Sequence, residues 1–219
     1  MTAPRHRPAR ADAVRRGGAA SRAALLAAAL LAVLGRFALP AASAPDSLLP
    51  TGTFEIARDA SSAVFFVPDN RGGFSGRTTQ LSGQIVVAQS TAEDYTAQVS
   101  ATIDAGTLTT QNGIRDAAMR AVYLRTAQFP AITFVGTASA RPGLGVAPFP
   151  AEIRGRLTLR DVTRDEQFTA TITALSRTYV ADATATLRMA DYGIPYPRAF
   201  IFVARDPVTV TLHLVARQP

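Results

Sequence analysis

The chain has no cysteine, no lysine and no tryptophan, and beyond His6 its only histidine is His213. Without cysteine there are no disulfides, so the fold must be stable through its core alone. With one histidine left, the usual zinc ligand sets and the Ser-His-Asp or Cys-His catalytic arrangements are excluded. GxGxxG, Walker and HExxH motifs are also absent. These absences favour a binding protein over an enzyme, with no metal ion and no cofactor.

Carboxylates are the remaining catalytic option. A hydrolase acting through acids alone would need two of them facing inward. The acids are instead scattered, and we expect most of them at strand ends or turns as solvated or capping groups: Glu55, Asp104, Asp116, Glu152, Asp182 and Asp191. His213 is expected on the solvent side of its strand, because Leu212 and Leu214 share the opposite face.

The first 44 residues have the three parts of a secretory signal peptide. An arginine-rich start is followed by the short apolar run "AALLAAALLAVLG" at 23–35 and by Ala42-Ser43-Ala44, an A-x-A cleavage site. The run is shorter than the roughly 20 residues that a membrane span needs. We therefore predict a signal peptide at 1–44, a linker at 45–52 and one domain at 53–219, in a periplasmic or secreted protein. Arg15-Arg16 leaves the choice between Sec and twin-arginine export open.

The charge resides mainly in this leader. Residues 1–44 contain seven arginines and one aspartate, hence +6 of the total net charge of +7. The remainder is nearly neutral, which argues against a nucleic-acid partner and predicts at most transient contact with membranes. The oligomeric state stays open, with a homodimer as one option.

From residue 53 onward apolar and polar residues alternate with a period of two. Such alternation predicts antiparallel strands with one polar face, and so many strands predict an all-β barrel or sandwich. Residues 161–165 are expected as a polar hairpin loop. The predicted strands are 53–57, 61–67, 80–88, 95–108, 130–141, 151–160, 166–175, 178–194 and 206–218.

Several spaced blocks resemble the YceI-like family of exported lipid-binding proteins. "DAGTLTTQNGIRDAAMRAVYLRTAQFPAITF" at 104–134 is similar to the family's Ile-Asp, Arg-Asp helix and Pro-x-Ile-x-Phe strand. "GRLTLRDVTRDEQF" at 155–168 and "ATLRMADYGI" at 185–194 resemble two further family elements. The chain departs from the family pattern at Asp161, where glycine is usual, at Thr78, where a large aromatic is usual, and at Phe54, where tryptophan is usual.

This resemblance implies an extended, lipocalin-like antiparallel barrel of about eight strands that holds a polyisoprenoid chain in its lumen. The alternatives are an isoprenoid-quinone carrier linked to a membrane cytochrome and a ligand-free interaction domain. Small residues in phase with the lumen are expected to leave room for the ligand: Ala101, Gly155, Ala170 and Ala185. The expected lumen residues are Val64, Phe66, Ile85, Ile103, Met119, Phe134, Leu157, Leu159, Ile172, Leu187, Met189 and Leu212.

The stretch "TLTTQNGIRDAAMRAVYL" at 107–124 predicts a short helix that closes one end of this barrel. Asn112 or Thr110 would cap its start. The i, i+3, i+4 pattern predicts an inward face drawn from Ile114, Ala118, Met119 or Val122 and an outward face of Arg115, Asp116 and Arg120. We expect Arg115-Asp116 to tie this segment to strand ends; the alternative is that Arg115 or Arg120 contacts a polar headgroup at the mouth.

Overall fold

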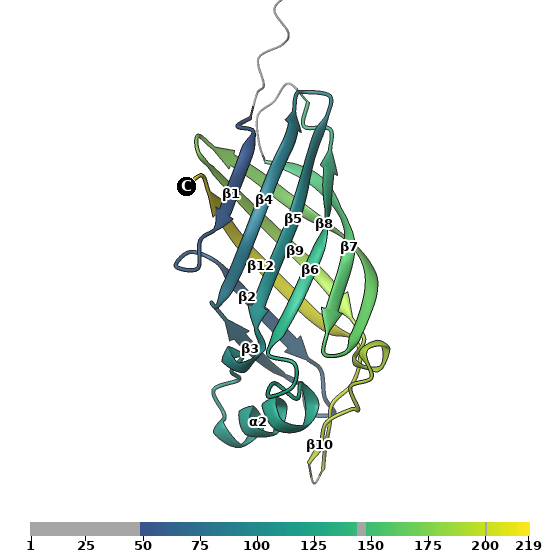
Figure 1. Cartoon of the computed structure of the whole chain (residues 1–219). Helices are drawn as coiled ribbons and strands as arrows, with labels where there is room; N and C mark the ends of the chain where they lie inside the picture. Colours follow the sequence, from purple (N-terminus) through teal and green to yellow (C-terminus); the bar gives the residue numbers. More distant parts are fainter. Residues whose placement is uncertain (1–48, 144–147, 200) are drawn as a thin grey trace, which may run out of the picture. The chain divides into compact units, whose positions relative to one another are not determined.

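The computed structural model describes residues 49–143, 148–199 and 201–219 (Figure 1). The predicted signal peptide at 1–44 lies outside these residues. Eight antiparallel strands form a barrel that closes where β1 pairs with β12, as the family resemblance predicted. In spatial order the strands are β1 (Gly52–Ile56), β4 (Leu81–Ser90), β5 (Tyr95–Asp104), β6 (Ala131–Ala140), β7 (Phe149–Leu159), β8 (Val162–Leu175), β9 (Thr178–Leu187) and β12 (Val208–Arg217).

Two strands extend the sheet beyond β12. β2 (Ser62–Val67) pairs with β12 and with β3 (Phe74–Thr78), and Arg77 of β3 forms a bridge to Thr109. β3 was not predicted, because "FSGRT" shows no apolar alternation. A small hairpin of β10 (Arg198–Ala199) and β11 (Phe202–Val203) lies near the same end of the barrel.

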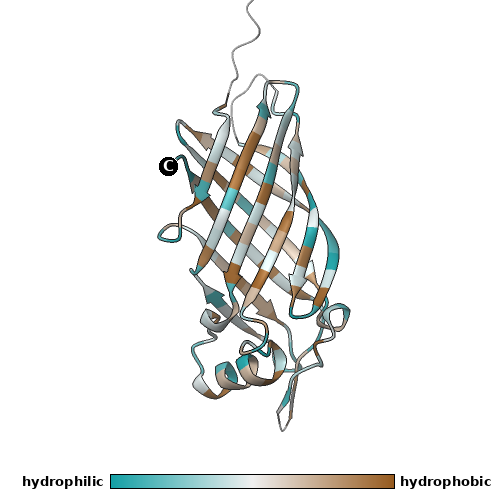
Figure 2. Cartoon of the chain, viewed as in Figure 1, coloured by the Kyte–Doolittle hydropathy of each residue, from teal (hydrophilic) through white to brown (hydrophobic). Residues whose placement is uncertain are grey.

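The alternation of the sequence matches the two faces of the barrel wall. On β7, Ile153 and Leu157 line the interior, while Arg154 and Arg156 are exposed. Figure 2 shows the resulting change between hydrophilic and hydrophobic positions along the strands. Apolar side chains facing one side and polar ones facing the other are what a closed antiparallel sheet in water requires.

Several predicted boundaries are wrong by a few residues. The turn between β7 and β8 consists of Arg160 and Asp161, so residues 162–165 belong to β8 rather than to a loop. β5 ends at Asp104, whose carboxylate accepts a hydrogen bond from the Gly106 backbone N–H at 2.9 Å and begins the short 3₁₀ helix η2 (Ala105–Thr107). Likewise β9 stops at Leu187, and η4 (Met189–Tyr192) follows.

One end of the barrel is filled by aromatic rings. Phe54 packs edge-on to Tyr179 with ring centroids 4.8 Å apart, and Tyr95 packs on Phe149 at 5.3 Å. The Tyr179 hydroxyl donates to the Pro50 carbonyl at 2.7 Å, and burial raises its pKa to about 12. This aromatic cluster, comprising Phe54, Tyr95, Phe149 and Tyr179, is fully buried and closes that end.

The helical segment lies at the opposite end of the barrel (Figure 1). It consists of α2 (Gly113–Ala118) followed by a π-helical stretch, η3 (Met119–Tyr123). Asn112 caps α2, as predicted, by accepting a hydrogen bond from the Arg115 backbone N–H at 3.0 Å. In the part of the chain that the structure describes, no helix is long and apolar enough to cross a membrane.

Candidate functional site: the barrel cavity

The barrel encloses a cavity of about 680 Å³ whose wall is almost entirely apolar. It extends from Tyr95 and Ile172, next to the aromatic cluster, to Ile114 and Arg198 at the α2 end. A volume of this size falls in the range of small-molecule binding sites. Predicted lumen residues that line it are Val64, Ile85, Ile103, Met119, Phe134, Leu157, Leu159, Ile172, Leu187, Met189 and Leu212.

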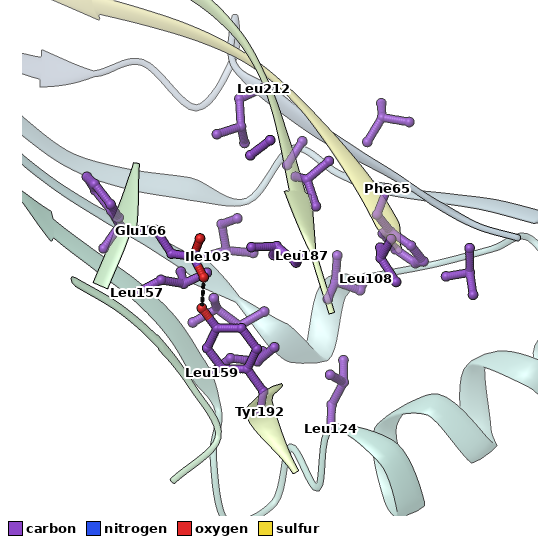
Figure 3. Close-up of a pocket in the computed structure, with 18 of the residues that line it drawn as sticks. Phe65, Ile103, Leu108, Leu124, Leu157, Leu159, Glu166, Leu187, Tyr192 and Leu212 are labelled. Carbon is purple, nitrogen blue, oxygen red and sulfur yellow. Dashed lines mark hydrogen bonds between the residues drawn. The ribbon is translucent and has the colours of Figure 1, made fainter. Parts of the chain in front are cut away.

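Leu157, Leu159, Leu187 and Leu212 are only half-buried although they point into the barrel (Figure 3). Their remaining exposed surface borders the cavity. In a filled core these leucines would be in contact on all sides, because protein interiors pack as densely as organic crystals. The wall therefore offers apolar surface to a ligand.

The predicted phase of β2 is wrong. Phe66 does not line the cavity and is 39% exposed, whereas Val64 lines it, as predicted, although it is equally exposed. The inward positions are Ala63, Phe65 and Val67. Phe65 faces inward because its ring lies over Gly76 on β3, where a Cβ atom would come within 2.2 Å of the ring.

The small residues were predicted correctly in three of four cases. Ala101, Ala170 and Ala185 line the cavity. Gly155 does not, because the Phe134 ring covers it. The three alanines therefore leave free volume in the cavity, whereas Gly155 accommodates the ring of Phe134.

The helical segment borders the cavity with three of the four predicted residues and also with Tyr123 and Leu124, which were not predicted. Ala118 and Met119 line it; Ile114 also borders it but is 87% exposed, and Val122 points away into solvent. The π-helical geometry that starts at Met119 explains the loss of phase, because a wider turn shifts later residues out of the i, i+3, i+4 pattern.

Asp116 is buried, contrary to the prediction that it faces outward. Its carboxylate accepts hydrogen bonds from the Thr110 backbone N–H at 2.8 Å, the Thr110 hydroxyl at 2.6 Å and the Thr109 hydroxyl at 2.7 Å. Burial by itself raises the pKa of Asp116, but these hydrogen bonds and the Arg120 charge outweigh burial, so the pKa lies below its usual value. Asp116 thus ties α2 to the chain before it.

The two arginines predicted to contact a headgroup lie in different places. Arg115 lines the cavity, donates from Nε to the Thr110 hydroxyl at 2.8 Å, and lies over the Phe74 ring at 4.3 Å. Arg120 does not line the cavity and forms an ion pair with Asp116 at 3.8 Å. Of the two, Arg115 therefore lines the cavity and Arg120 does not; Arg188 and Arg198, which were not predicted, line it as well.

Two carboxylates line the cavity, Asp69 and Glu166. Asp69 shapes a turn by accepting hydrogen bonds from the backbone N–H groups of Arg71 and Gly73. Glu166 accepts a hydrogen bond from the Tyr192 hydroxyl at 2.5 Å (Figure 3). Neither Asp69 nor Glu166 was predicted at the cavity, although Glu166 has the same phase as Phe168, Ala170 and Ile172 on β8.

Other polar groups have local partners. His213 is exposed, as predicted, and its Nδ1 lies 2.7 Å from Asp182. Among the residues with described positions, no group of three or more His, Cys, Asp or Glu side chains could hold a metal ion.

A closed antiparallel barrel around an apolar cavity defines a class of proteins that bind hydrophobic molecules. Within this class, the family model of the YceI-like domain matches residues 54–216. The chain therefore belongs to the YceI-like family. No curated protein matches the chain.

Solved structures share the fold at low sequence identity. The polyisoprenoid binding domain from Saccharophagus degradans, implicated in plant cell wall breakdown, is 20% identical, with a TM-score of 0.58 over 78% of this chain and 100% of that one. BcnA from Burkholderia cenocepacia is 15% identical, with a TM-score of 0.59 over 73% and 98%. A YceI protein from Campylobacter jejuni is 14% identical, with a TM-score of 0.50 over 66% and 84%.

Proposed function

We propose that this protein is a carrier that holds a polyisoprenoid, or a similar long apolar chain, in the barrel cavity and performs no catalysis. The observation that carries the proposal is the cavity of about 680 Å³ with its half-buried leucine wall. The fold shared with a domain described as polyisoprenoid-binding supports the choice of ligand class.

The energetics allow binding. An apolar ligand that buries roughly 500 Å² gains about 12 kcal/mol at ~25 cal/mol per Å². Association and ordering of a flexible chain cost on the order of 4–15 kcal/mol. The wall is formed before the ligand arrives, so its own ordering adds little to this cost. At the lower end of this cost the net gain is about 8 kcal/mol, which corresponds to micromolar binding.

The carrier function is tested by what the protein contains. The chain is purified from its native host without detergent, examined by native mass spectrometry, and extracted with organic solvent. An isoprenoid bound in a one-to-one ratio supports the proposal. If that isoprenoid is a quinone, the protein is an isoprenoid-quinone carrier. Repeated recovery of ligand-free protein that also fails to bind added polyisoprenoid contradicts the proposal and leaves an interaction domain.

We further propose that the protein acts in the periplasm after removal of residues 1–44. The pattern of basic, apolar and small residues in that segment supports export. N-terminal sequencing of protein from the periplasmic fraction should give Ala44 or Pro45 as the first residue. Recovery of the intact chain in the membrane fraction would indicate an anchor instead.

A further inference from the structure

Glu166 is an ionisable group on the inner wall of an apolar cavity. It lies on β8 two residues before Phe168, and both side chains line the cavity. Leu157, Ile103 and Leu187 line the same cavity (Figure 3). A carboxylate in such surroundings is unfavourable unless its oxygens are hydrogen-bonded, because it has lost part of its hydration.

Only one of its two oxygens has a protein partner. Oε1 accepts the Tyr192 hydroxyl at 2.5 Å, a distance typical of a charge-assisted O–H···O⁻ bond. In residues 49–143, 148–199 and 201–219, Glu166 forms no ion pair within 4.0 Å and no second hydrogen bond. One oxygen therefore remains to accept a hydrogen bond from a ligand.

Arg188 and Arg198 line the same cavity but form no ion pair with Glu166 within 4.0 Å, and two further arginines donate to backbone carbonyls beside Tyr192. Arg164 donates from Nε to the Asp191 carbonyl at 2.8 Å, and Arg160 donates to the Gly193 carbonyl at 3.0 Å. Both therefore fix the η4 segment that carries Tyr192. The negative charge of Glu166 is not neutralised by either of them.

Tyr192 holds the carboxylate in place. It is fully buried, and its hydroxyl can donate only while protonated. Burial, followed by the hydrogen bond and charge of Glu166, raises the pKa of Tyr192 well above its ordinary value. The hydroxyl therefore stays protonated over the whole physiological range and orients Glu166.

We propose that Glu166 and Tyr192 form a polar anchor for a ligand whose long apolar chain ends in a neutral hydroxyl group. The ligand hydroxyl would donate to the free oxygen of Glu166. At Glu166 itself a phosphorylated or carboxylated end would be disfavoured, because a second negative charge would face the carboxylate. Arg115, Arg188 and Arg198 also line the cavity, so the comparison with a phosphorylated ligand measures whether their positive charge outweighs that of Glu166. This inference rests on the proposed carrier function and specifies the ligand class.

The position of the anchor also sets the direction of the ligand. Glu166 lies near the start of β8, and Tyr192 belongs to η4; both are at the α2 end of the barrel (Figure 1). The apolar wall continues from there towards Ile172 and Tyr95, where the aromatic cluster closes the cavity. The hydroxyl end is therefore placed near the mouth, and the apolar chain extends inward.

The test compares ligands that differ only at the polar end. Geranylgeraniol, its methyl ether and its monophosphate compete for ligand-free protein, and bound species are counted by native mass spectrometry. The alcohol should bind about tenfold more tightly than the ether, as expected for one hydrogen bond to a charged acceptor, and should exceed the phosphate as well. In Glu166→Gln the preference for the alcohol over the ether should fall to about twofold, and the monophosphate should bind more tightly than it does to the wild type.

Tyr192→Phe keeps the ring and removes the hydroxyl that donates to Glu166. The preference for the alcohol over the ether should therefore weaken without loss of binding. Glu55→Gln on the exposed face of β1 is the matched control and should behave as the wild type. Equal binding of alcohol and ether by the wild type, or an unchanged preference in Glu166→Gln, would overturn the anchor while leaving the carrier function intact. If none of the three ligands binds, the carrier function is wrong. Stronger binding of geranylgeranylamine than of the alcohol would assign the anchor to cations.

Discussion

The ring of Phe134 lies against Gly155 on the neighbouring strand: a Cβ atom at Gly155 would come within 2.6 Å of the Phe134 Cζ atom. Gly136 stands directly opposite Gly155 and meets the same ring. The two glycines leave a flat area on the inner wall on which the ring rests, a known way of covering strand glycines with an aromatic side chain. The ring therefore takes little of the cavity, although phenylalanine is one of its largest lining residues.

Gly155→Ala should destabilise the barrel. Its Cβ atom would come within 2.5 Å of the Val135 carbonyl oxygen, which is backbone and cannot rotate away. Overpacking of this kind costs about 1–3 kcal/mol. Urea unfolding followed by circular dichroism measures the loss. Gly113→Ala is the control, because nothing lies within 4 Å of that position and alanine favours the helix by up to about 1 kcal/mol. Equal stability of both variants would contradict the packing of Phe134.

The sequence predicted the barrel strands well and the direction of certain side chains poorly. In "SSAVFFV" two phenylalanines are adjacent, so either phase of β2 places one of them inside, and alternation cannot choose. The choice is made by Gly76, which belongs to a strand that the sequence analysis did not predict and which accommodates the Phe65 ring.

The burial of acidic side chains is a second feature that could not be predicted from the sequence. Asp116 was expected at the surface because acids usually are, and no position was predicted for Glu166. Both are held inside by donors that become visible only in the fold: Thr109 and Thr110 for Asp116, and Tyr192 for Glu166. Tyr192 is 26 residues away from Glu166 along the chain, so no local pattern connects them. The phase of β8 could have placed Glu166 inside, but its partner could not have been predicted.

Asp116→Asn should reduce stability by about 2–3 kcal/mol at pH 7, because an amide nitrogen would replace one of the oxygens that accept from Thr109 and Thr110. The folded-state pKa of Asp116 is lowered. The stability that its charge provides is therefore fully present above the unfolded pKa of about 4 and is lost as the pH falls through the folded-state pKa. The difference in the free energy of unfolding between wild type and Asp116→Asn should therefore be smaller at pH 3 than at pH 7. Urea midpoints at the two pH values measure it.

Asp59→Asn serves as the control for this pH dependence. Asp59 is exposed and pairs with the exposed Arg217 at 3.1 Å, so its replacement should change stability by less than about 1 kcal/mol. A gap for Asp116→Asn that is the same at pH 3 and pH 7 would show that the charge of Asp116 is not what stabilises α2.

Ala185→Leu should displace the ligand without harming the fold. Ala185 lines the cavity from β9 and is only half-buried, so a larger side chain can extend into free space. Bound lipid after purification should fall severalfold, while the free energy of unfolding of the ligand-free protein changes by less than about 1 kcal/mol. Thr186→Leu, on the exposed side of the same strand, should keep its lipid. A loss of several kcal/mol at Ala185 would mean that the barrel is packed there and holds no ligand.

If an isoprenoid quinone enters the cavity, the anchor should discriminate between its redox forms. A quinol hydroxyl can donate to the free oxygen of Glu166, whereas a quinone carbonyl can only accept and would face a carboxylate. Decylubiquinol should therefore bind about tenfold more tightly than decylubiquinone. Preferential binding of the reduced form raises the midpoint potential of the bound two-electron couple by about 30 mV per factor of ten. Redox titration of the complex measures this shift, and Glu166→Gln should remove most of it while Glu55→Gln keeps it. A shift to lower potential in the wild type would mean that the Tyr192 hydroxyl donates to a quinone carbonyl instead, and that Glu166 is not the ligand acceptor.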